Sequence, residues 1–298
     1  MATDQLEFTN PVERYSSISP PEQRQPEPGL ESKMEPVPDI GENTYRGTGR
    51  LLGRKALITG GDSGIGAATA IAFAREGADV AIVYLPSEES DAQNVARIVS
   101  EAGRRAVTIP GDLVDPAFCI EAVQQAVKEL DGLDILVNNA AKQIARDGLA
   151  DIPDDELEET YAANILAIFR VTRAALPHLP AGSSIINSTS IQAYEPAPPL
   201  LDYASTKAAI NNFTKGLAQE LAPQGIRVNA VSPGPIWTVL QPTDGQPLEK
   251  LPEFGKNTPL GRAGQPTELA PAYVFLASSE SSYVLGATIH VNGGRPTP

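Results

Sequence analysis

The pair of residues best placed to do chemistry in this sequence is Tyr203 and Lys207, in the stretch Tyr-Ala-Ser-Thr-Lys. Side chains four positions apart lie on one face of a helix, so the phenol and the ammonium group are expected to be neighbours. A free tyrosine has a pKa of about 10 and is a poor base at neutral pH. A nearby ammonium lowers that pKa, so the pair could act as a general acid and base. The alternative is an ordinary helix start with a solvated lysine, because this spacing also occurs by chance.

Hydroxyl side chains at the end of an upstream apolar run supply a second chemical group. The stretch Ile-Asn-Ser-Thr-Ser ends at Ser190, thirteen residues before Tyr203. A serine here could donate a hydrogen bond to a carbonyl or alkoxide oxygen beside the tyrosine hydroxyl. Ser188 and Thr189 are competing hydroxyls, and the spacing to the tyrosine selects Ser190.

A glycine-rich turn near the start of the periodic region could bind a phosphate. Gly60, Gly64 and Gly66 follow a short apolar run at 56–58, and an alanine-rich segment with helical apolar spacing comes next. Strand, tight turn and helix N-terminus in this order let the backbone approach an anion and donate N–H groups to it. The pattern predicts a pyrophosphate-binding turn, and a glycine turn without a ligand is the alternative.

The elements that must position these groups are short apolar strands alternating with amphipathic helices. Strands are expected at 56–58, 79–84, 105–110, 133–138, 184–188, 226–231 and 287–291. Helices are expected after the glycine turn and at 88–101, 116–130, 153–176, 203–221 and 267–277. This alternation predicts an α/β fold, a single doubly wound Rossmann domain whose seven-stranded parallel sheet carries helices on both faces. The domain is expected to span 48–298, after a proline-rich N-terminal arm at 1–47.

In a doubly wound sheet the ligand binds beyond the carboxyl ends of the strands. Three further strand ends carry residues suited to that place: an acid that could accept a hydrogen bond from an adenine amine, an asparagine pair, and a Pro-Gly loop. They are Asp112 with Leu113, the pair Asn138 and Asn139 followed by Ala140, and the set Pro233, Gly234, Ile236 and Thr238. The asparagine pair could instead tie neighbouring loops together.

Residues 50–294 resemble the short-chain dehydrogenase/reductase family, because the glycine turn, the asparagine stretch, the serine, the Tyr-x-x-x-Lys pair and the Pro-Gly loop occur in that family's order. The resemblance implies an NAD(P)-dependent oxidoreductase in which Tyr203 transfers the proton and Lys207 lowers its pKa and holds the ribose. It also implies that Ser190 polarises the carbonyl and that Asn164 supports a relay water. A solvent-facing asparagine is the alternative for the last.

The same resemblance implies the cofactor contacts. The backbone of Ile236 would hold the nicotinamide amide and Thr238 would lie near the phosphates, whereas Ala141 replaces a glycine usual in the family. The expected cofactor residues are Gly60, Asp62, Ser63, Gly64, Ile65, Gly66, Tyr84, Leu85, Asp112, Leu113, Asn138, Ala140, Tyr203, Lys207, Pro233, Gly234, Ile236 and Thr238. The turn, the Pro-Gly loop, the 265–277 segment and the arm resemble a bacterial general-stress branch of the family. A homotetramer is implied as well.

The choice between NAD and NADP depends on the end of the second strand, where a carboxylate would hold the ribose 2′-OH. Tyr84 and Leu85 occupy that end without an aspartate. Ser63 stands where NADP-linked relatives often carry a basic residue, and Asp62 beside it would disfavour a 2′-phosphate. Both cofactors are expected to bind, with a slight preference for NAD.

Composition narrows the partners and the setting. The net charge of −14 argues against nucleic acid and anionic membranes as partners. Cys119 is the only cysteine, so no intrachain disulfide can form, which is typical of the cytoplasm. Residues 1–30 lack the apolar centre of a signal peptide, and two histidines without a cysteine cluster predict no metal site.

The proline-rich arm could be a disordered tail or an extended arm that lies on the surface or on another subunit. The second reading is favoured, because apolar anchors are spaced along it. They are Leu6, Phe8, Tyr15, Leu30, Met34 and Tyr45.

The sequence therefore predicts an enzyme acting on a small alcohol, aldehyde or ketone. The segments at 192–201 and 239–257 are expected to border the substrate, and their composition does not identify it. The alternative is a catalytically silent dinucleotide-binding sensor or scaffold.

Overall fold

The computed structural model describes residues 4–15 and 18–297. Seven parallel strands form one sheet in the order β3-β2-β1-β4-β5-β6-β7, which confirms the predicted doubly wound α/β fold. The strands are β1 (Lys55–Thr59), β2 (Asp79–Tyr84), β3 (Ala106–Pro110), β4 (Ile135–Asn138), β5 (Ser184–Ser188), β6 (Arg227–Pro233) and β7 (Thr288–Val291). The central strands are buried along nearly their whole length, as expected of apolar runs covered on both faces.

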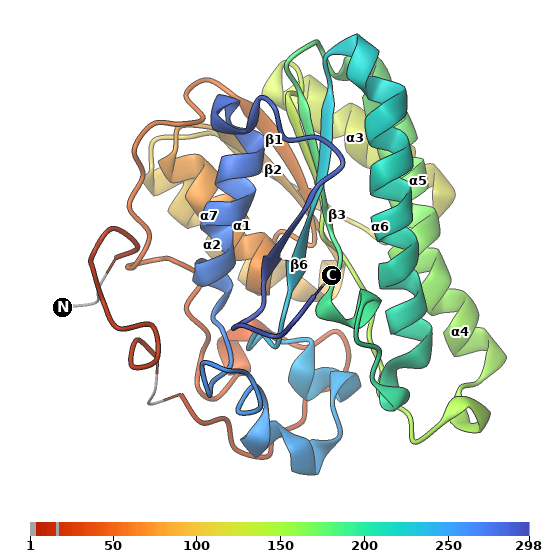
Figure 1. Cartoon of the computed structure of the whole chain (residues 1–298). Helices are drawn as coiled ribbons and strands as arrows, with labels where there is room; N and C mark the ends of the chain where they lie inside the picture. Colours follow the sequence, from red (N-terminus) through yellow and green to blue (C-terminus); the bar gives the residue numbers. More distant parts are fainter. Residues whose placement is uncertain (1–3, 16–17, 298) are drawn as a thin grey trace.

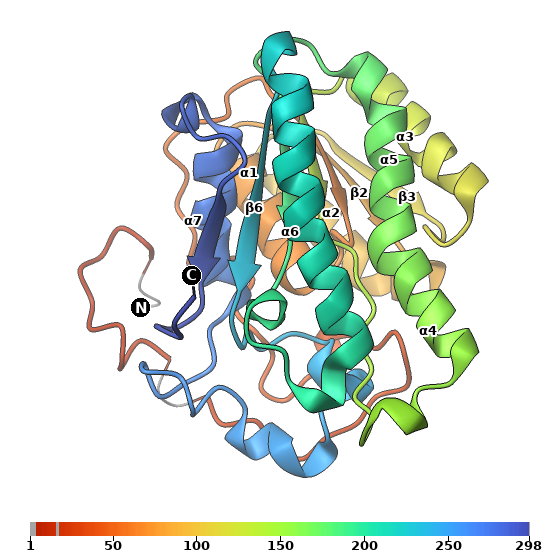
Figure 2. The ribbon, with the colours of Figure 1, turned by 45° about the vertical axis from the view of Figure 1, so that its right-hand side comes forward.

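Helices cover the two faces of this sheet, as Figures 1 and 2 show from two directions. One face carries α1 (Gly64–Arg75), α2 (Glu89–Glu101) and α7 (Pro266–Ala277), which pack in one hydrophobic cluster with β1 and β2. A second cluster lies under the helices of the other face. These are α3 (Pro116–Leu130), α4 (Asp154–Tyr161), α5 (Ala167–Ala175) and α6 (Leu201–Leu221).

The predicted helix over 153–176 is interrupted. A π-helical segment, η4 (Ala162–Leu166), separates α4 from α5. Such segments are rare and often accompany functional sites, and this one contains Asn164. The periodicity of the sequence could not show it, because the apolar spacing continues across the segment.

Short 3-10 or π turns link the main elements. They are η1 (Glu31–Lys33), η2 (Pro86–Glu88), η3 (Leu149–Asp151), η5 (Leu176–His178), η6 (Ile191–Ala193), η7 (Pro198–Leu200), η8 (Ala222–Gln224), η9 (Gln241–Gly245), η10 (Leu248–Glu253) and η11 (Ser279–Ser281). Within the part of the chain that is described, no helix is long and apolar enough to cross a membrane.

The N-terminal arm follows an extended course along the domain and passes the carboxyl ends of the strands, beside the segment at 239–257 (Figure 1). Gln25 N–H donates to the Pro242 carbonyl at 3.0 Å, and the Trp237 indole donates to the Pro36 carbonyl at 2.7 Å. Within one chain, the arm therefore lies on the surface of the domain, as the favoured interpretation of the sequence expected. Of the six expected anchors, Met34 and Tyr45 are buried, whereas Leu6 and Phe8 are exposed.

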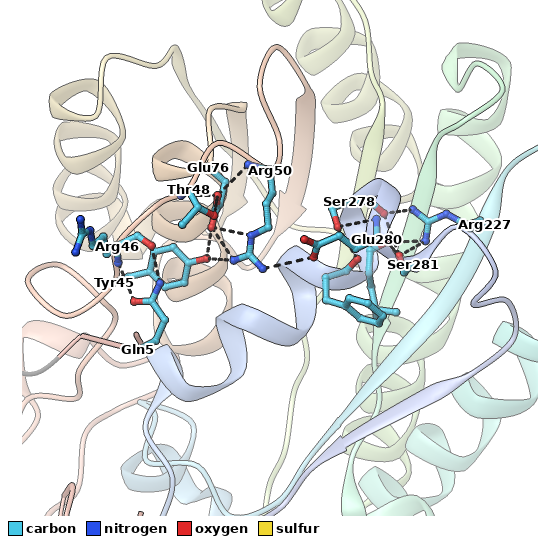
Figure 3. Close-up of polar contacts among 12 residues, drawn as sticks. Gln5, Tyr45, Arg46, Thr48, Arg50, Glu76, Arg227, Ser278, Glu280 and Ser281 are labelled. Atoms are coloured by element: carbon cyan, nitrogen blue, oxygen red, sulfur yellow. Dashed lines mark hydrogen bonds and ion pairs between the residues drawn. The ribbon is translucent and has the colours of Figure 1, made fainter. Parts of the chain in front are cut away.

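The end of the arm is fixed by a buried carboxylate, Glu76, at the end of α1 (Figure 3). Arg50 donates to it from Nη2 at 2.7 Å and from its backbone N–H at 3.0 Å. The Tyr45 hydroxyl donates at 2.7 Å, and Thr48 N–H donates at 2.9 Å. Burial raises the pKa of Glu76, but these hydrogen bonds outweigh it and lower the pKa to about 2.

Candidate active site

A cavity of about 820 Å³ lies at the carboxyl ends of the strands, where a doubly wound sheet binds its ligand. Its walls come from the glycine turn, from the ends of β2, β4, β5 and β6, and from α6 and the arm. Ser190, Tyr203 and Lys207 border it together with the glycine turn. The expected catalytic residues and the expected phosphate-binding turn therefore line the same cavity.

The glycine turn has the shape of a phosphate cradle. Gly60 and Gly64 have φ angles of 62° and 51°, in the left-handed region that favours glycine. A Cβ at Gly66 would lie 1.7 Å from the Gly60 carbonyl oxygen, so only glycine fits where α1 packs against the turn. Ile65 lines the cavity at the first turn of α1, where helix N–H groups attract an anion.

The end of β2 differs from its prediction. The Tyr84 side chain is buried away from the cavity, and its hydroxyl donates to Glu89 at 2.6 Å. Leu85 lines the cavity, and so does Glu88, whose carboxylate folds back to accept the Leu85 N–H at 3.0 Å. An acidic group thus stands at this strand end after all, because η2 returns Glu88 to it.

Asp62 faces the same part of the cavity from the glycine turn. It is 2% exposed, and its Oδ2 has no hydrogen-bond partner among the described residues. Burial raises the pKa of Asp62 to about 6, against hydrogen bonds from its own backbone and from Ser63 that lower it. A ligand hydroxyl would complete the contacts of this carboxylate.

The asparagine pair after β4 divides into two roles. Asn138 is buried and donates to Thr172 and Asn187, so its side chain ties strands and helix together outside the cavity. Asn139 lines the cavity and donates to the Gly60 carbonyl at 3.0 Å. The expected cofactor residues included Asn138 of this pair but not Asn139. Strand alternation explains the difference, because neighbouring side chains point to opposite sides.

The remaining predicted cofactor residues border the cavity. They are Ser63, Asp112, Leu113, Ala140, Pro233, Gly234, Ile236 and Thr238. A Cβ added at Gly64 would come within 3.0 Å of the Thr238 side chain, so the glycine turn and the Pro-Gly loop close on each other. The two motifs are far apart in the sequence and form one wall.

Tyr203 and Ser190 both border the cavity. Ser190 follows β5 and accepts the Gln192 N–H at 3.1 Å, which fixes its rotamer. Burial raises the pKa of the Tyr203 phenol to about 12, and a hydrogen bond with Ser190 lowers it in part. The phenol therefore keeps its proton at neutral pH.

Lys207 lies one helical turn beyond Tyr203, with Nζ 5.3 Å from the centre of the tyrosine ring. Its Nζ donates to the Ser188 carbonyl at 3.0 Å. Burial lowers the pKa of Lys207 to about 7. Burial raises the pKa of Tyr203 and only Ser190 lowers it in part, so the lowering of this pKa by Lys207 stays a prediction.

Asn164 is fully buried in the π-helical segment. Its side chain accepts Lys142 N–H at 2.7 Å and donates to the Lys142 carbonyl at 2.9 Å and to Thr206 at 3.1 Å. It therefore joins the loop after β4 to α6, the helix that carries Tyr203. Ala163 rather than Asn164 borders the cavity among the described residues.

The far end of the cavity is polar. Lys142 forms ion pairs at 3.0 Å with Glu27 of the arm and with Glu159 of α4. Gln143 lines the same end and donates to the Gly245 carbonyl at 2.6 Å. Within residues 4–15 and 18–297, no group of three or more acidic, histidine or cysteine side chains could hold a metal ion.

Comparison with known proteins places this chain among oxidoreductases. A family model described as enoyl-(acyl carrier protein) reductase matches residues 60–295. The uncharacterized oxidoreductase YghA of Escherichia coli is 57% identical over 285 residues, which cover 96% of this chain and 97% of that protein. General stress protein 39 of Bacillus subtilis is 49% identical over 280 residues, which cover 94% of this chain and 97% of that protein.

Two further comparisons concern proteins whose cofactor is stated. NADPH-dependent aldehyde reductase 1, chloroplastic, of Arabidopsis thaliana is 46% identical over 274 residues, which cover 90% of this chain and 95% of that protein. The crystal structure of a short chain dehydrogenase from Burkholderia cenocepacia in complex with NADP superimposes with a TM-score of 0.76. It is 37% identical and covers 82% of this chain and 98% of its own.

Proposed function

The chain belongs to the short-chain dehydrogenase/reductase family and is an oxidoreductase, and from this premise we propose that it transfers a hydride between a nicotinamide cofactor and an alcohol or carbonyl substrate. The resemblance to a bacterial general-stress branch is confirmed by the match to general stress protein 39. The observation that carries the proposed reaction is that Ser190, Tyr203 and Lys207 border one cavity together with the glycine turn.

Tyr203 and Ser190 would act together on the substrate oxygen. In the direction of carbonyl reduction, both hydroxyls donate hydrogen bonds to the carbonyl oxygen and stabilise the charge that develops there. Tyr203 then gives its proton to the alkoxide, and its raised pKa means that the phenol carries this proton at neutral pH. In the direction of alcohol oxidation the tyrosine must first lose that proton, and a protonated Lys207 would stabilise the phenolate.

Asn164 is proposed as a positioning residue for this pair. Its contacts to Lys142 and Thr206 fix α6 relative to the loop after β4. The relay water that the family resemblance implies is proposed at this asparagine.

The cradle fits a dinucleotide. The close approach of Gly66 to the Gly60 carbonyl leaves backbone accessible to a pyrophosphate, and the unpartnered Asp62 Oδ2 suits a ribose hydroxyl. Ser63, Ile65 and Thr238 would hold the phosphates, whereas Asp112 and Leu113 would border the adenine. The bound cofactor would supply or accept the hydride, and the chain supplies the proton and the orientation.

The proposed preference for NAD is modest and rests on Asp62 and Glu88, which both border the ribose end. The comparisons do not support this preference, because the aldehyde reductase is NADPH-dependent and the Burkholderia protein contains NADP. Binding of NADP is therefore proposed as well. Direct titration with each cofactor at one ionic strength decides between them.

The substrate end favours small molecules that carry several polar groups. Lys142, Gln143 and Gln192 border it, with Gln246 and Lys250 from the segment at 239–257. These side chains can hydrogen-bond hydroxyl, aldehyde or carboxylate groups, whereas a large apolar ketone would leave them unpaired. Small alcohols and aldehydes are therefore the substrate class we propose.

Assembly as a homotetramer and a cytoplasmic setting are proposed too. Exposed apolar side chains on α4, η4, α5 and α6 support the first, since such clusters mark contact surfaces. They are Leu157, Tyr161, Leu166, Phe169 and Leu201. The single buried Cys119 supports the second.

Steady-state rates over a panel of alcohols and aldehydes with NAD(H) and NADP(H) test the reaction. Turnover is expected for polar members of the panel and is expected to vanish in Tyr203→Phe. Tyr194→Phe is the matched control, because Tyr194 packs on His290 outside the cavity. Tight cofactor binding with no turnover of any compound would favour the silent sensor instead.

A further inference from the structure

Four carboxyl groups meet beside the glycine turn, and each comes from a different element. We name this set the acidic cluster: Glu31 of the arm, Asp62 of the glycine turn, Glu88 of η2 and Asp91 of α2. All four are between 2% and 9% exposed. Only Asp62 and Glu88 border the cavity, so the other two lie behind the wall that faces a ligand.

Glu31 is the link between the arm and the glycine turn. Its Oε2 accepts the backbone N–H of Gly64 at 2.5 Å, and its own N–H donates to Asp91 Oδ2 at 2.5 Å. Ser63, at the N-cap of α1, makes no side-chain cap bond to the helix, so the arm supplies the cap from outside. An arm residue thus contacts the backbone amide next to the residues that line the ribose end.

Among the described residues, no cation forms an ion pair with the acidic cluster. None of the ion pairs found among the described residues includes any of its members. Burial raises the pKa of Glu31 to about 8, and the neighbouring Asp91 and Asp62 raise it further against the hydrogen bond from Gly64. Burial also raises the pKa of Glu88 to about 8, with Asp62 as the next cause. Part of the negative charge of the cluster is therefore removed, because Glu31 and Glu88 are partly protonated at neutral pH.

We propose that Glu31 is a specificity-determining residue of the cofactor site, through which the N-terminal arm disfavours NADP relative to NAD. The inference rests on the proposed use of a nicotinamide dinucleotide. Glu31 acts from behind the glycine turn, by adding its charge to those of Asp62 and Glu88 and by fixing Gly64.

The physical basis is the difference between a hydroxyl and a phosphate at the ribose. A 2′-OH can donate a hydrogen bond to the unpartnered Asp62 Oδ2. A 2′-phosphate has no hydrogen to share once ionised, and it brings about two negative charges at neutral pH. In a buried, poorly screened site each further carboxylate then opposes it, whereas the uncharged hydroxyl is affected little.

This selectivity should depend on pH with a definite sign. As pH rises from 7 to 9, Glu31 and Glu88 lose protons, and the acidic cluster becomes more negative. The phosphate is already ionised in this window, since its second pKa is about 6. The groups that face Glu31 are Asp91 of α2 and Asp62 of the turn, both acidic. The ratio of the NADP Kd to the NAD Kd should therefore increase with pH.

The experiment titrates the full chain with NAD and with NADP at pH 7, 8 and 9 and fixed ionic strength. Glu31→Gln keeps an oxygen that can accept the Gly64 N–H and removes only the charge. At pH 9 the variant should bind NADP about fivefold more tightly than wild type, with the NAD Kd changed by about twofold at most. At pH 7 the two proteins should differ less.

Glu22→Gln is the matched control, because it removes the same charge from an exposed position of the same arm. It should leave both Kd values unchanged. If the ratio of the NADP Kd to the NAD Kd rose with pH equally in wild type and in Glu31→Gln, the inference would be overturned. The proposed function would still stand. Failure of wild type to bind either cofactor would overturn both.

A second measurement needs no substitution and applies if Glu31→Gln does not fold. Calorimetric titration of wild type at pH 8 in two buffers of different ionisation enthalpy counts the protons taken up with each cofactor. NADP should bring more protons into the complex than NAD, because the phosphate favours protonated carboxyls in the acidic cluster. Equal proton counts for the two cofactors would contradict the inference.

Discussion

The N-terminal arm meets the domain at two buried acidic sites that differ in how their charge is compensated. Glu76 is surrounded by donors from Arg50, Thr48 and Tyr45, and its pKa is lowered to about 2 (Figure 3). Glu31 has acidic neighbours and one backbone donor, and its pKa is raised to about 8. One chain segment therefore ends in a satisfied ion pair and passes through an unsatisfied acidic cluster.

The two sites therefore suit different roles. A compensated carboxylate stabilises the fold, whereas an uncompensated cluster can respond to a ligand. A satisfied carboxylate has nothing to offer a ligand, and it loses much when one partner is removed. An uncompensated cluster is costly in the folded state, and such sites concentrate where function requires them. The position of each site agrees with this view, since Glu76 lies at the far end of α1 and the acidic cluster lies at its N-terminus, beside the cavity.

The largest expected effect comes from Tyr203→Phe, which provides the reference in which neither arm site is touched. The substitution removes the proton donor and keeps the ring, so turnover should fall by about 10²- to 10⁴-fold. Cofactor Kd values should stay within about twofold of wild type, because the ring still fills its place. Rates from stopped-flow absorbance and Kd values from titration check the two halves. A variant that retains a tenth of the wild-type rate would exclude the proposed acid.

Glu76→Gln should lower the stability of the fold and leave cofactor binding unchanged, which distinguishes Glu76 from Glu31. The amide leaves Arg50, itself 26% exposed at the side chain, without its carboxylate. The free energy of unfolding should fall by about 2–4 kcal/mol, as measured by urea denaturation. The ratio of NADP to NAD affinity should not change. A shift of that ratio equal to the one in Glu31→Gln would break the proposed division between the two sites.

The pH dependence of stability should have opposite signs at the two sites. Glu76 has a folded-state pKa below the unfolded value of 4.5, so its contribution is present above that pH and is lost as pH falls towards 2. Glu31 has a raised pKa, so the folded state binds the extra proton, and stability is lost as pH rises from 4.5 to about 8.

Denaturation of wild type and both variants across pH 2 to 9 checks these windows. In Glu76→Gln the free energy of unfolding should fall less between pH 4.5 and 2 than in wild type. In Glu31→Gln it should fall less between pH 4.5 and 8. If either variant flattened the other window, the charges of the two sites would not be independent.

The sequence predicted the fold well because the strands are apolar runs with turn residues at their ends. The range 79–84 and the range 116–130 were predicted to the residue. The Tyr203–Lys207 face followed from helical spacing alone. Such features are local, so a single stretch of sequence contains the information that decides them.

What the sequence missed depends on contacts between distant segments. Glu31 lies in a proline-rich stretch without periodicity, and its partner Gly64 is 33 positions away. Glu88 follows β2 by four residues, and only the η2 turn returns it to the strand end. Its one local signal was Pro86 followed two residues later by an acid, a sequence compatible with a short turn. The π-helical segment around Asn164 had no local signal of this kind.

The smallest expected effect comes from Ser63→Arg, which tests whether the acidic cluster sets cofactor choice by charge. Ser63 lines the cavity next to Asp62, so an arginine here can reach a 2′-phosphate with charge-assisted hydrogen bonds. It can equally pair with Asp62 or Glu88, which would consume part of the gain. NADP should therefore bind about threefold to tenfold more tightly in the variant, with little change for NAD.

Combining Ser63→Arg with Glu31→Gln decides how the two positions interact. If Glu31 acts by charge on the same phosphate, the double variant should not equal the sum of the single changes, because the arginine already screens part of the negative field. The NADP gain of Glu31→Gln should then be smaller in the arginine background than in wild type. Titration of the four proteins at pH 9 gives this coupling directly. Strict additivity would mean that Glu31 and Ser63 act on separate features of the site, and that the charge of Glu31 does not act on the phosphate that the substituted side chain contacts.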